Sequence, residues 1–470
     1  MGFVFFDTET TGLKLGFDQI VHFAAIRTDN ELNEVERFEA RSRLLPHVVP
    51  HPTALKTNGI SIGRLTDSSL PSHYAMMRAV RQKLLEWSPS IFVGYNSIRF
   101  DEEMLRHALF QTLHSAYLTS NHGNCRADVL SLVMAAAAVT PACLTVPIGA
   151  EGRATFRLDQ LAVANQVAHP MAHDAMADAE ATLGLSRCVY ERSSELWQRF
   201  VRFSKKATVA DFVGSDDGFI LTEFFGNEAY HTPVVYIGTV PDQPNARLCL
   251  TIDDAIVGAA ASDDEQLRLE LSRKPCPVRR LRVNAAPTLT ALYDASKSML
   301  GGATIEQLEA QARRIKNDTD LCARIVSAYL ATREPWPPSR HVEERTHDGF
   351  PGPQDEGRMA AFHGASGRVA LELVSAFEDE RLRALGLRLI YFHARLSLPE
   401  NIRRDLDRTL TDRLVETDAG GLTLHEALAE TDKLLSDGAA ADHEDLLTEY
   451  RAYLLERIAR VTEFRAKHCT

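Results

Sequence analysis

The sequence predicts three successive parts: an α/β domain with a mixed sheet, a smaller β-rich domain and an all-α C-terminal domain. Strand-like and helix-like segments alternate over the first ~185 residues, which is typical of an α/β layer fold. Short strand-like runs separated by Asn, Gly, Pro and Asp follow from about residue 194 to 340. Beyond Pro399 the chain has no proline and repeats apolar residues at helical spacing. We expect the domains at residues 1–190, 194–342 and 345–470.

Each element of the first domain is predicted from its pattern of apolar residues. The strands are short apolar runs, whereas the helices repeat apolar positions every three or four residues. Acids in the first turn of the helix near Phe100 agree with the direction of the helix dipole. The predicted strands are residues 3–9, 19–29, 35–45 and 90–96, and the predicted helices are residues 72–87 and 100–113.

The elements of the later domains are predicted in the same way. Proline and glycine clusters at residues 333–339 and 348–357 mark turns between the second and third domains. The β-rich domain has strand-like runs at residues 218–227, 230–240, 246–253 and 277–284, followed by a helix at 304–316. The last helix, at residues 443–464, carries one apolar stripe made of Leu447, Tyr450, Leu454, Ile458 and Val461.

The composition is that of an ordinary globular chain. Of the 470 residues, 45% are hydrophobic and 25% are charged, and no apolar run approaches the ~20 residues of a transmembrane helix. The N-terminus lacks the basic region of a secretory signal. The seven cysteines form no C-x-x-C pair, so we expect neither zinc sites nor a disulfide framework, and a reducing cytoplasm fits. The net charge of −12 argues against a nucleic-acid partner, but one groove can still be lined with Lys and Arg.

The first strand ends in two acids that point to the same side. Asp7 and Glu9 are two residues apart, and side chains at that spacing share one face of a sheet. Two neighbouring carboxylates repel unless a proton or a cation lies between them, and such hard oxygen ligands suit Mg²⁺ or Mn²⁺. The alternative is a solvated strand end, but the apolar approach and the Thr-Thr-Gly turn that follows favour a metal site.

Two later motifs carry the other candidate residues. Asp101 follows a predicted strand and lies near a helix start, where Asp is also a common N-cap. His173 and Asp178 lie five residues apart at the entrance of a helix, where an exposed His and a first-turn acid are common as well. In order along the chain, the three motifs read D-x-E, N-x-x-x-F-D and H-x-x-x-x-D, and the series is far more specific than any one of them.

This series resembles the DEDD class of 3′→5′ exonucleases, in the branch with His in its third motif. The resemblance implies a ribonuclease H-like fold, which is a mixed sheet flanked by helices. Further segments resemble bacterial exodeoxyribonuclease I, a family in which a nuclease domain is followed by an SH3-like β domain and a helical C-terminal domain. These segments are residues 23–29, 94–103, 156–165, 173–182, 334–345 and 379–395.

The resemblance implies a mechanism and an activity. Asp7, Glu9 and Asp178 would hold two Mg²⁺ ions, for which Mn²⁺ could substitute, and Asp101 would complete the carboxylate set. His173 would be the general base, since an unperturbed imidazole pKa near 6.5 suits that role at neutral pH. The implied activity is processive 3′→5′ hydrolysis of single-stranded DNA to nucleoside 5′-monophosphates, in bacterial DNA repair and recombination, in the cytoplasm.

The substrate contacts are also implied by the resemblance. Arg157 would contact the DNA backbone, Glu9 and Thr10 the terminal nucleotide, and Arg106 and Tyr117 the single strand. The family has aromatic residues in the next segment, whereas residues 118–128 contain none here, so this part of the DNA path is in doubt. A surface salt bridge is the alternative role for Arg157. Basic residues of the second domain could line a groove: Lys205, Lys206, Arg279, Arg280 and Arg282.

A protein partner is implied too, because exodeoxyribonuclease I enzymes bind the acidic C-terminal tail of single-stranded DNA-binding protein. Arg314 and Arg324 are the candidate contacts, with plain helix-surface charge as the alternative. We expect a monomer and no membrane partner. Two rival functions remain: a 3′→5′ exoribonuclease, or an inactive single-strand DNA-binding protein. Inactivity would predict a lost carboxylate, and none of the four is lost.

Overall fold

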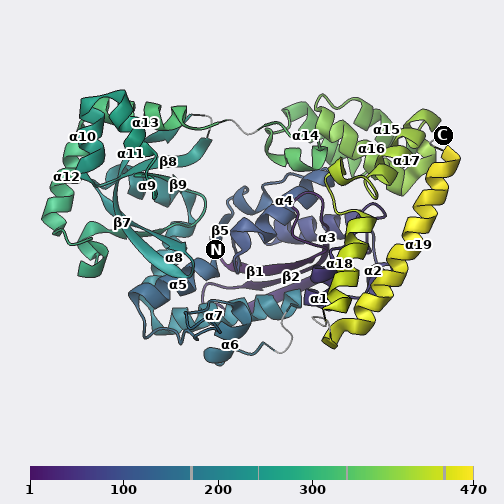
Figure 1. Cartoon of the computed structure of the whole chain (residues 1–470), viewed down its shortest axis with the longest axis horizontal. Coiled ribbons are helices and arrows are strands. Elements are labelled where there is room, and N and C mark those ends of the chain that lie inside the picture. The colour runs from purple at the N-terminus through teal and green to yellow at the C-terminus, as the bar shows by residue number, and fades with distance from the viewer. Residues whose placement is uncertain (170–172, 242, 335–336, 438–440, 469–470) are drawn as a thin grey trace.

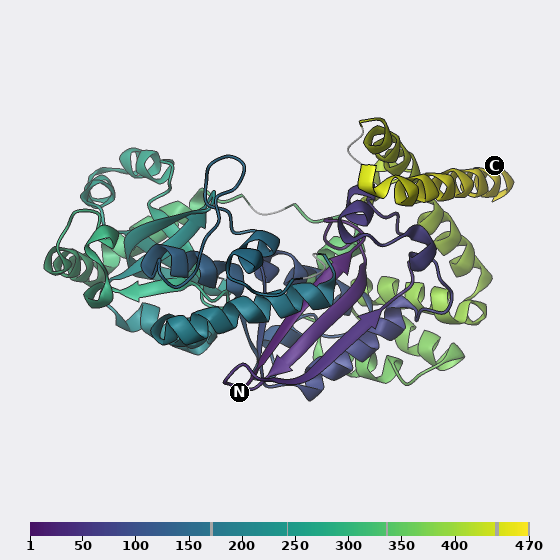
Figure 2. The ribbon, with the colours of Figure 1, turned by 90° about the horizontal axis from the view of Figure 1, so that it is seen from below.

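The structure, a computed structural model, describes residues 1–169, 173–241, 243–334, 337–437 and 441–468. Two residues of the predicted turn at 333–339, residues 335 and 336, and also Cys469, lie outside this part of the chain. The first sheet lies in the middle of the molecule. The second sheet and most of the C-terminal helices lie on opposite sides of it in both views (Figures 1 and 2).

The first sheet is mixed, as the sequence predicts. Its strand order is β3-β2-β1-β4-β5, so the strand that carries the first motif is the central one. β1 pairs antiparallel with β2 and parallel with β4. The strands are β1 (Phe3–Thr10), β2 (Ile20–Thr28), β3 (Glu34–Arg41), β4 (Ile91–Gly94) and β5 (Cys125–Asp128).

Helices cover both faces of this sheet because alternate residues of β1 are apolar on both sides. Phe3 and Phe5 pack in one core with α5 (Val129–Val139) and α7 (Ala175–Arg192). Val4 and Phe6 pack in a second core with α3 (His73–Glu86) and α4 (Asp101–Gln111). The other helices of this part are α1 (Pro52–Asn58), α2 (Ile62–Leu65), α6 (Leu158–Ala164), α8 (Ser194–Ser204) and α9 (Lys206–Ser215).

The first core extends beyond residue 190. Trp197 of α8 is buried in it, and its ring centroid lies 5.3 Å from that of Phe3. Phe203, at the other end of the same helix, belongs to a core of the second sheet instead. Helix α8 therefore joins the two parts by packing, and the predicted boundary at 190–194 stays a prediction.

The second sheet confirms the predicted β-rich region. It is antiparallel throughout, in the order β10-β6-β7-β8-β9. The strands are β6 (Phe219–Phe225), β7 (Glu228–Val240), β8 (Gln243–Thr251), β9 (Val278–Arg282) and β10 (Thr288–Ala291). The attached helices are α10 (Asp254–Ser262), α11 (Asp264–Leu271), α12 (Ile305–Asn317) and α13 (Thr319–Ala331). The SH3-like assignment stays a prediction.

The C-terminal part is helical in its described residues, and the stretch beyond Pro399, which has no proline, agrees with the prediction. It begins with the 3₁₀ segment η5 (Val342–His347), which lies against α4. The helices that follow are α14 (Pro353–Phe362), α15 (Gly367–Ser375), α16 (Glu380–Ala394), α17 (Glu400–Asp412), α18 (Leu424–Ser436) and α19 (Glu444–His468). None of the described helices is long and apolar enough to cross a membrane.

The C-terminal helices are docked on the first domain by two separate cores. One joins Phe110 and Leu113, at the end of α4, to α14–α16. The other joins Leu55 of α1 to Tyr450 and Leu454 of α19, and the Tyr450 hydroxyl donates to the Pro50 carbonyl at 2.5 Å. The predicted stripe on the last helix is thus the face that closes on the first domain.

Leu454→Ala is expected to lower the free energy of unfolding by roughly 2–5 kcal/mol, because it leaves a cavity between α19 and α1. Leu455→Ala is the matched control, since that neighbouring side chain is 43% exposed and its loss is expected to cost within about 0.5 kcal/mol. Chemical denaturation of both variants measures the difference. Equal effects would mean that α19 is not docked through this stripe.

Candidate active site

The end of β1 carries acids on the face that α7 covers. Side chains alternate along a strand, so Asp7 and Glu9 share a side with Phe3 and Phe5, which pack against α7. Thr8 points to the opposite side, toward α4. The burial of β1 on both faces holds these polar side chains in fixed positions.

Helix α7 brings a third carboxylate to Asp7 and Glu9. Asp174 is the N-cap of this helix, and its side chain accepts from the backbone N–H groups of Met176 and Ala177. Asp178 follows one turn later. Carboxylate oxygens of Asp7, Glu9 and Asp178 all lie within 4.8 Å of one another.

Asp101 supports this group from the other face of β1. It is the first residue of α4, it is buried, and its Oδ1 accepts a hydrogen bond of 2.6 Å from the Thr8 hydroxyl. The N-cap position belongs to Phe100, so Asp101 does not serve as the cap that was its alternative role. Its charge nevertheless acts on Asp7.

The four carboxyl groups have raised pKa values because they are buried and close together. Burial, followed by the charges of Asp101, Asp178 and Glu9, raises the pKa of Asp7 well above its ordinary value. Burial and the charge of Asp178 raise the pKa of Glu9 to about 9. Burial raises the pKa of Asp101 to about 7, against the hydrogen bond from Thr8.

This arrangement fits divalent cations. Several carboxylates that resist ionisation in one place can all be charged at neutral pH only if positive charge is placed among them. Their oxygens are hard ligands of the type that Mg²⁺ and Mn²⁺ prefer. Asp7, Glu9 and Asp178 together could hold an ion.

A histidine close to the third motif also contacts the carboxylate group, although it was not predicted. Nε2 of His169 lies 2.5 Å from Oδ1 of Asp178. His173 is exposed and has a left-handed backbone with φ of 66°. Burial raises the pKa of Asp178, while the hydrogen bond from His169 and the charges of both histidines lower it. Both imidazoles are therefore neighbours of the carboxylate group, and the base role of His173 stays a prediction.

The predicted substrate residues lie in different environments. Arg157 is 63% exposed on its side chain and pairs with Asp159 at 3.2 Å, which is the surface ion pair named as its alternative role. Arg106 is buried between the carboxylates of Glu102 and Glu103 and lies over the ring of Tyr117, 5.2 Å from its centroid. Its guanidinium is thus engaged within the chain, and the spacing of Glu102 and Glu103, four and three residues before it on the same helix, is the local pattern that indicates this pairing.

Thr10 and some of the candidate basic residues have internal partners too, whereas Lys205, Lys206 and Arg282 are exposed. The Thr10 hydroxyl donates to the Gly12 carbonyl at 2.7 Å. Arg279 pairs with Glu223 at 3.4 Å, and Arg280 donates to Gln243. In the proposed partner site, Arg324 donates to the Ala260 carbonyl and to Asp264, whereas Arg314 is exposed on α12.

Two supporting residues were not predicted. Thr8 lies between the two motif acids of β1, and only the alternation of side chains would have aimed it at α4. His169 lies four residues before His173, outside the H-x-x-x-x-D motif, and its signal was a second histidine close to that motif. Their roles depend on contacts made across the fold.

The range that holds the first sheet and the carboxylate group matches a known class of domain. Residues 4–186 match a family described as "Exonuclease", RNase T, so the first domain is an exonuclease domain. This range contains all five motif residues.

The chain as a whole resembles exodeoxyribonuclease I, as its motifs predict. It is 26% identical to that enzyme of Haemophilus influenzae over 432 residues, which are 85% of this chain and 88% of the relative. The Escherichia coli enzyme is 26% identical over 403 residues, 82% of this chain and 83% of the relative. A solved structure of E. coli exonuclease I with a dA16 oligonucleotide has a TM-score of 0.83 at 22% identity, covering 98% of this chain and 99% of that one.

Two other similar solved structures are described as containing SSB or a zinc ion. One is of SSB and exonuclease I with the inhibitor CFAM, with a TM-score of 0.81 at 21% identity, covering 97% of this chain and 99% of that one. The other is the zinc-bound form of the E. coli enzyme with single-stranded DNA, with a TM-score of 0.82 at 22% identity, covering 98% and 99%. At these identities the likeness concerns the fold.

Asp7→Asn is expected to stabilise the protein in EDTA while removing activity. Burial gives the Asp7 carboxyl a higher pKa in the folded protein than in the unfolded chain. The folded protein therefore loses stability as the pH rises from the ordinary pKa of the group, near 4, toward its folded pKa. The wild-type melting temperature in EDTA should therefore fall between pH 5 and 9, and the fall should be smaller in the variant. Added Mg²⁺ should restore the wild type more than the variant.

Thermal denaturation at several pH values measures this effect. Glu31→Gln, which changes an exposed loop acid, is the control and should follow the wild type. If the melting temperature of Asp7→Asn depended on pH as that of the wild type does, repulsion among the clustered carboxylates would not be the effect that the cation relieves.

Proposed function

We propose that this chain is a processive 3′→5′ exonuclease that acts on single-stranded DNA and releases nucleoside 5′-monophosphates. The observation that carries the proposal is the convergence of Asp7, Glu9 and Asp178 within 4.8 Å, with Asp101 behind them. Phosphodiester hydrolysis needs groups that stabilise charge on both the attacking and the leaving oxygen. A set of buried carboxylates has no such capacity alone, but it can hold cations that do.

The proposed catalytic roles fall to the following residues. Asp7, Glu9 and Asp178 would hold two Mg²⁺ ions, which supply the charge stabilisation of a two-metal site. Asp101 would fix the position of β1 through Thr8 and add negative charge to the group. His173 would take the proton of the attacking water, and His169 would orient Asp178 through its hydrogen bond.

The choice of substrate is supported by the relatives. Solved E. coli structures are named for complexes with DNA oligonucleotides, and the chain matches them over nearly its whole length. Arg157 is exposed near the start of α6, and its pair with Asp159 is weak enough to be exchanged for a phosphate. Glu9, Thr10, Arg106 and Tyr117 complete the proposed contacts, the last two as a stacked pair.

The proposed biological setting follows from the same resemblance. The enzyme would act in DNA repair and recombination as a monomer in a bacterial cytoplasm. Single-stranded DNA-binding protein would be its partner through an acidic tail that meets Arg314 and Arg324. Arg314 is the stronger candidate because it is exposed, whereas Arg324 already pairs with Asp264 at 2.8 Å.

The alternatives are an exoribonuclease and an inactive DNA-binding protein. The four acids converge in one place, which favours catalysis over a retired site. The length over which the chain matches exodeoxyribonuclease I favours DNA over RNA. Both alternatives are outcomes of the following experiment.

A 5′-labelled single-stranded DNA oligomer is expected to shorten from its 3′ end in Mg²⁺, and to stay intact in EDTA or with Asp7→Ala. The duplex and the RNA of the same sequence should be degraded far more slowly. Gel electrophoresis of the time course reads out length and direction. Faster digestion of RNA would support the exoribonuclease, and binding without cleavage in Mg²⁺ or Mn²⁺ would support the inactive protein.

His173→Ala is expected to lower the turnover rate by about 10²–10⁴-fold, since it would remove the general base. His169→Ala is the comparison, and it should cost less because His169 would act only through Asp178. The rate of each variant between pH 6 and 9 separates the two roles, since only loss of the base should remove the acidic limb of the profile. Near-normal activity of His173→Ala across this range would reassign the base.

A further inference from the structure

A second cluster of metal-ligand side chains lies outside the carboxylate site. Glu103 and His107 are one turn apart on α4, and His347 is the last residue of η5. One ligand atom from each of the three lies within 4.8 Å of the other two. They are brought together from positions about 240 residues apart in the sequence.

We propose that Glu103, His107 and His347 form a binding site for one transition-metal cation of the Zn²⁺ type. Two imidazoles and one carboxylate are a ligand set that Zn²⁺ takes, with its fourth position left to water. Imidazole ligands favour such a cation over Mg²⁺, which prefers oxygen. The site goes beyond the proposed nuclease function and shares no ligand with it.

Nδ1 of His107, the ring nitrogen that would not bind the cation, makes a hydrogen bond of the kind found in known metal sites. This Nδ1 lies 2.8 Å from the Glu343 carbonyl, which can only accept, so Nδ1 carries the proton. Nε2 then has its lone pair available as a ligand. Burial lowers the pKa of His107, which keeps the ring neutral.

His347 has the matching arrangement. Its Nδ1 lies 2.8 Å from the hydroxyl of Tyr117, which can donate or accept, and its Nε2 lies 2.9 Å from Oε2 of Glu103. Oε1 of Glu103 is taken by Arg106 at 2.6 Å, so Oε2 is the oxygen left to face the histidines. Oε2 of Glu103 and Nε2 of His347 therefore face each other, and the other polar atom of each side chain is held by a neighbour.

The size of the cluster suits a small cation after a slight adjustment. Ligands at about 2.0–2.1 Å from tetrahedral Zn²⁺ are about 3.3 Å apart. The pair of Glu103 and His347 would widen by a few tenths of an ångström from 2.9 Å. The side chain of His347 is 46% exposed, so it has room to move and the cation can enter from solvent.

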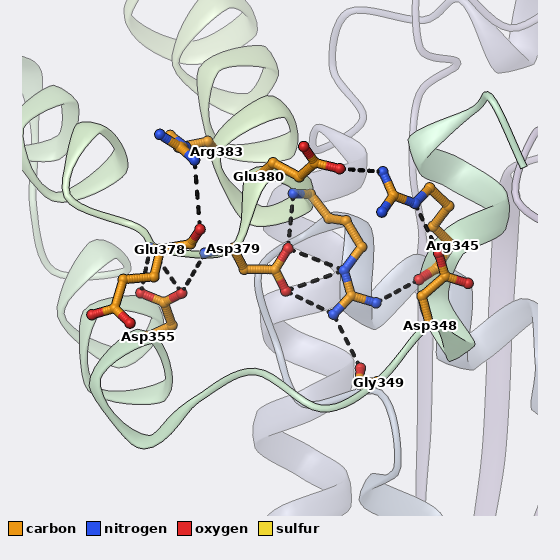
Figure 3. Close-up of polar contacts among 9 residues, drawn as sticks. Arg345, Asp348, Gly349, Asp355, Glu378, Asp379, Glu380 and Arg383 are labelled. Carbon is orange, nitrogen blue, oxygen red and sulfur yellow. Dashed lines mark hydrogen bonds and ion pairs between the residues drawn. The ribbon is translucent and has the colours of Figure 1, made fainter. Parts of the chain in front are cut away.

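Residues of α16 hold the backbone before and after His347, and Figure 3 draws these polar contacts. Arg381 donates to the carbonyls of Arg345 and Gly349, which flank His347. Arg345 pairs with Glu380 at 2.6 Å and with Asp348 at 2.8 Å (Figure 3). A cation would therefore bind a prepared site and fasten η5, the start of the helical C-terminal part, to α4.

Zn²⁺ binding to the full-length chain tests the proposal. Because the carboxylate site can also take Zn²⁺, every protein in the comparison carries Asp7→Asn and Glu9→Gln. In that background we expect one Zn²⁺ per chain in competition with a chromophoric chelator. His347→Ala should lower the affinity by at least about tenfold, while His341→Ala, a histidine at the start of η5, should leave it unchanged.

His347→Cys is a second variant that separates loss of a ligand from loss of the fold. A thiolate can replace imidazole on Zn²⁺, so this variant should regain binding, and Co²⁺ should give it a thiolate charge-transfer absorption that the His347→Ala protein lacks. No Zn²⁺ bound in the background protein, or binding that His347→Ala leaves unchanged, would overturn the proposal. The cluster would then be a hydrogen-bonded ion pair only.

Discussion

Burial of mutually repelling carboxylates at the end of β1 is the constraint around which the first domain is built. Asp7 lies on the central strand of a sheet that is covered on both faces, so its carboxylate is largely withdrawn from solvent. Folding places Asp178 and Asp101 near it from two different helices. This arrangement costs free energy. Bound cations offset the cost, because their positive charge neutralises the repulsion between the ionised carboxylates. A site of this kind is rigid before its ions arrive.

Helix α4 links that site to the C-terminal helices. Its first residue, Asp101, belongs to the carboxylate group, its first and second turns carry Glu103 and His107, and its far end packs Phe110 against α14–α16. A displacement of η5 or of the C-terminal helices would therefore act on Asp101 through one rigid element. Cation binding at Glu103, His107 and His347 would strengthen this connection without touching the chemistry.

The elements and the motif acids could be predicted from the sequence because they depend on local patterns. The apolar run of residues 3–6 and the acids that follow identify β1, and the spacing of Asp7 and Glu9 gives their common face. Asp101 and Asp178 follow from motifs whose residues are close in the sequence. The existence of all three parts was likewise visible in their composition.

The remaining contacts are harder to predict because the sequence does not say which of several possible partners a side chain meets. Arg106 looked available for DNA, but Glu102 and Glu103 on its own helix and the ring of Tyr117 enclose it. His169 meets Asp178, whereas His173 is exposed and has a positive φ, and the sequence does not distinguish these two histidines. Nothing near His347 in the sequence indicates that it meets α4.

The net charge of −12 is a weaker argument against a nucleic-acid partner once the positions of the acids are known. Some of them pair with arginines inside the protein, and such pairs contribute little to the outer field although they leave the net total unchanged. Glu343 is buried and pairs with Arg388 and Arg413, whose charges bring its pKa to about 2 even though burial alone would raise it. Glu102 is buried against Arg126 in the same way. Four further acids are grouped at a site that cations would neutralise. The total charge therefore says little about the potential along any one surface, and a chain with this balance can bind a polyanion wherever its unpaired basic residues gather.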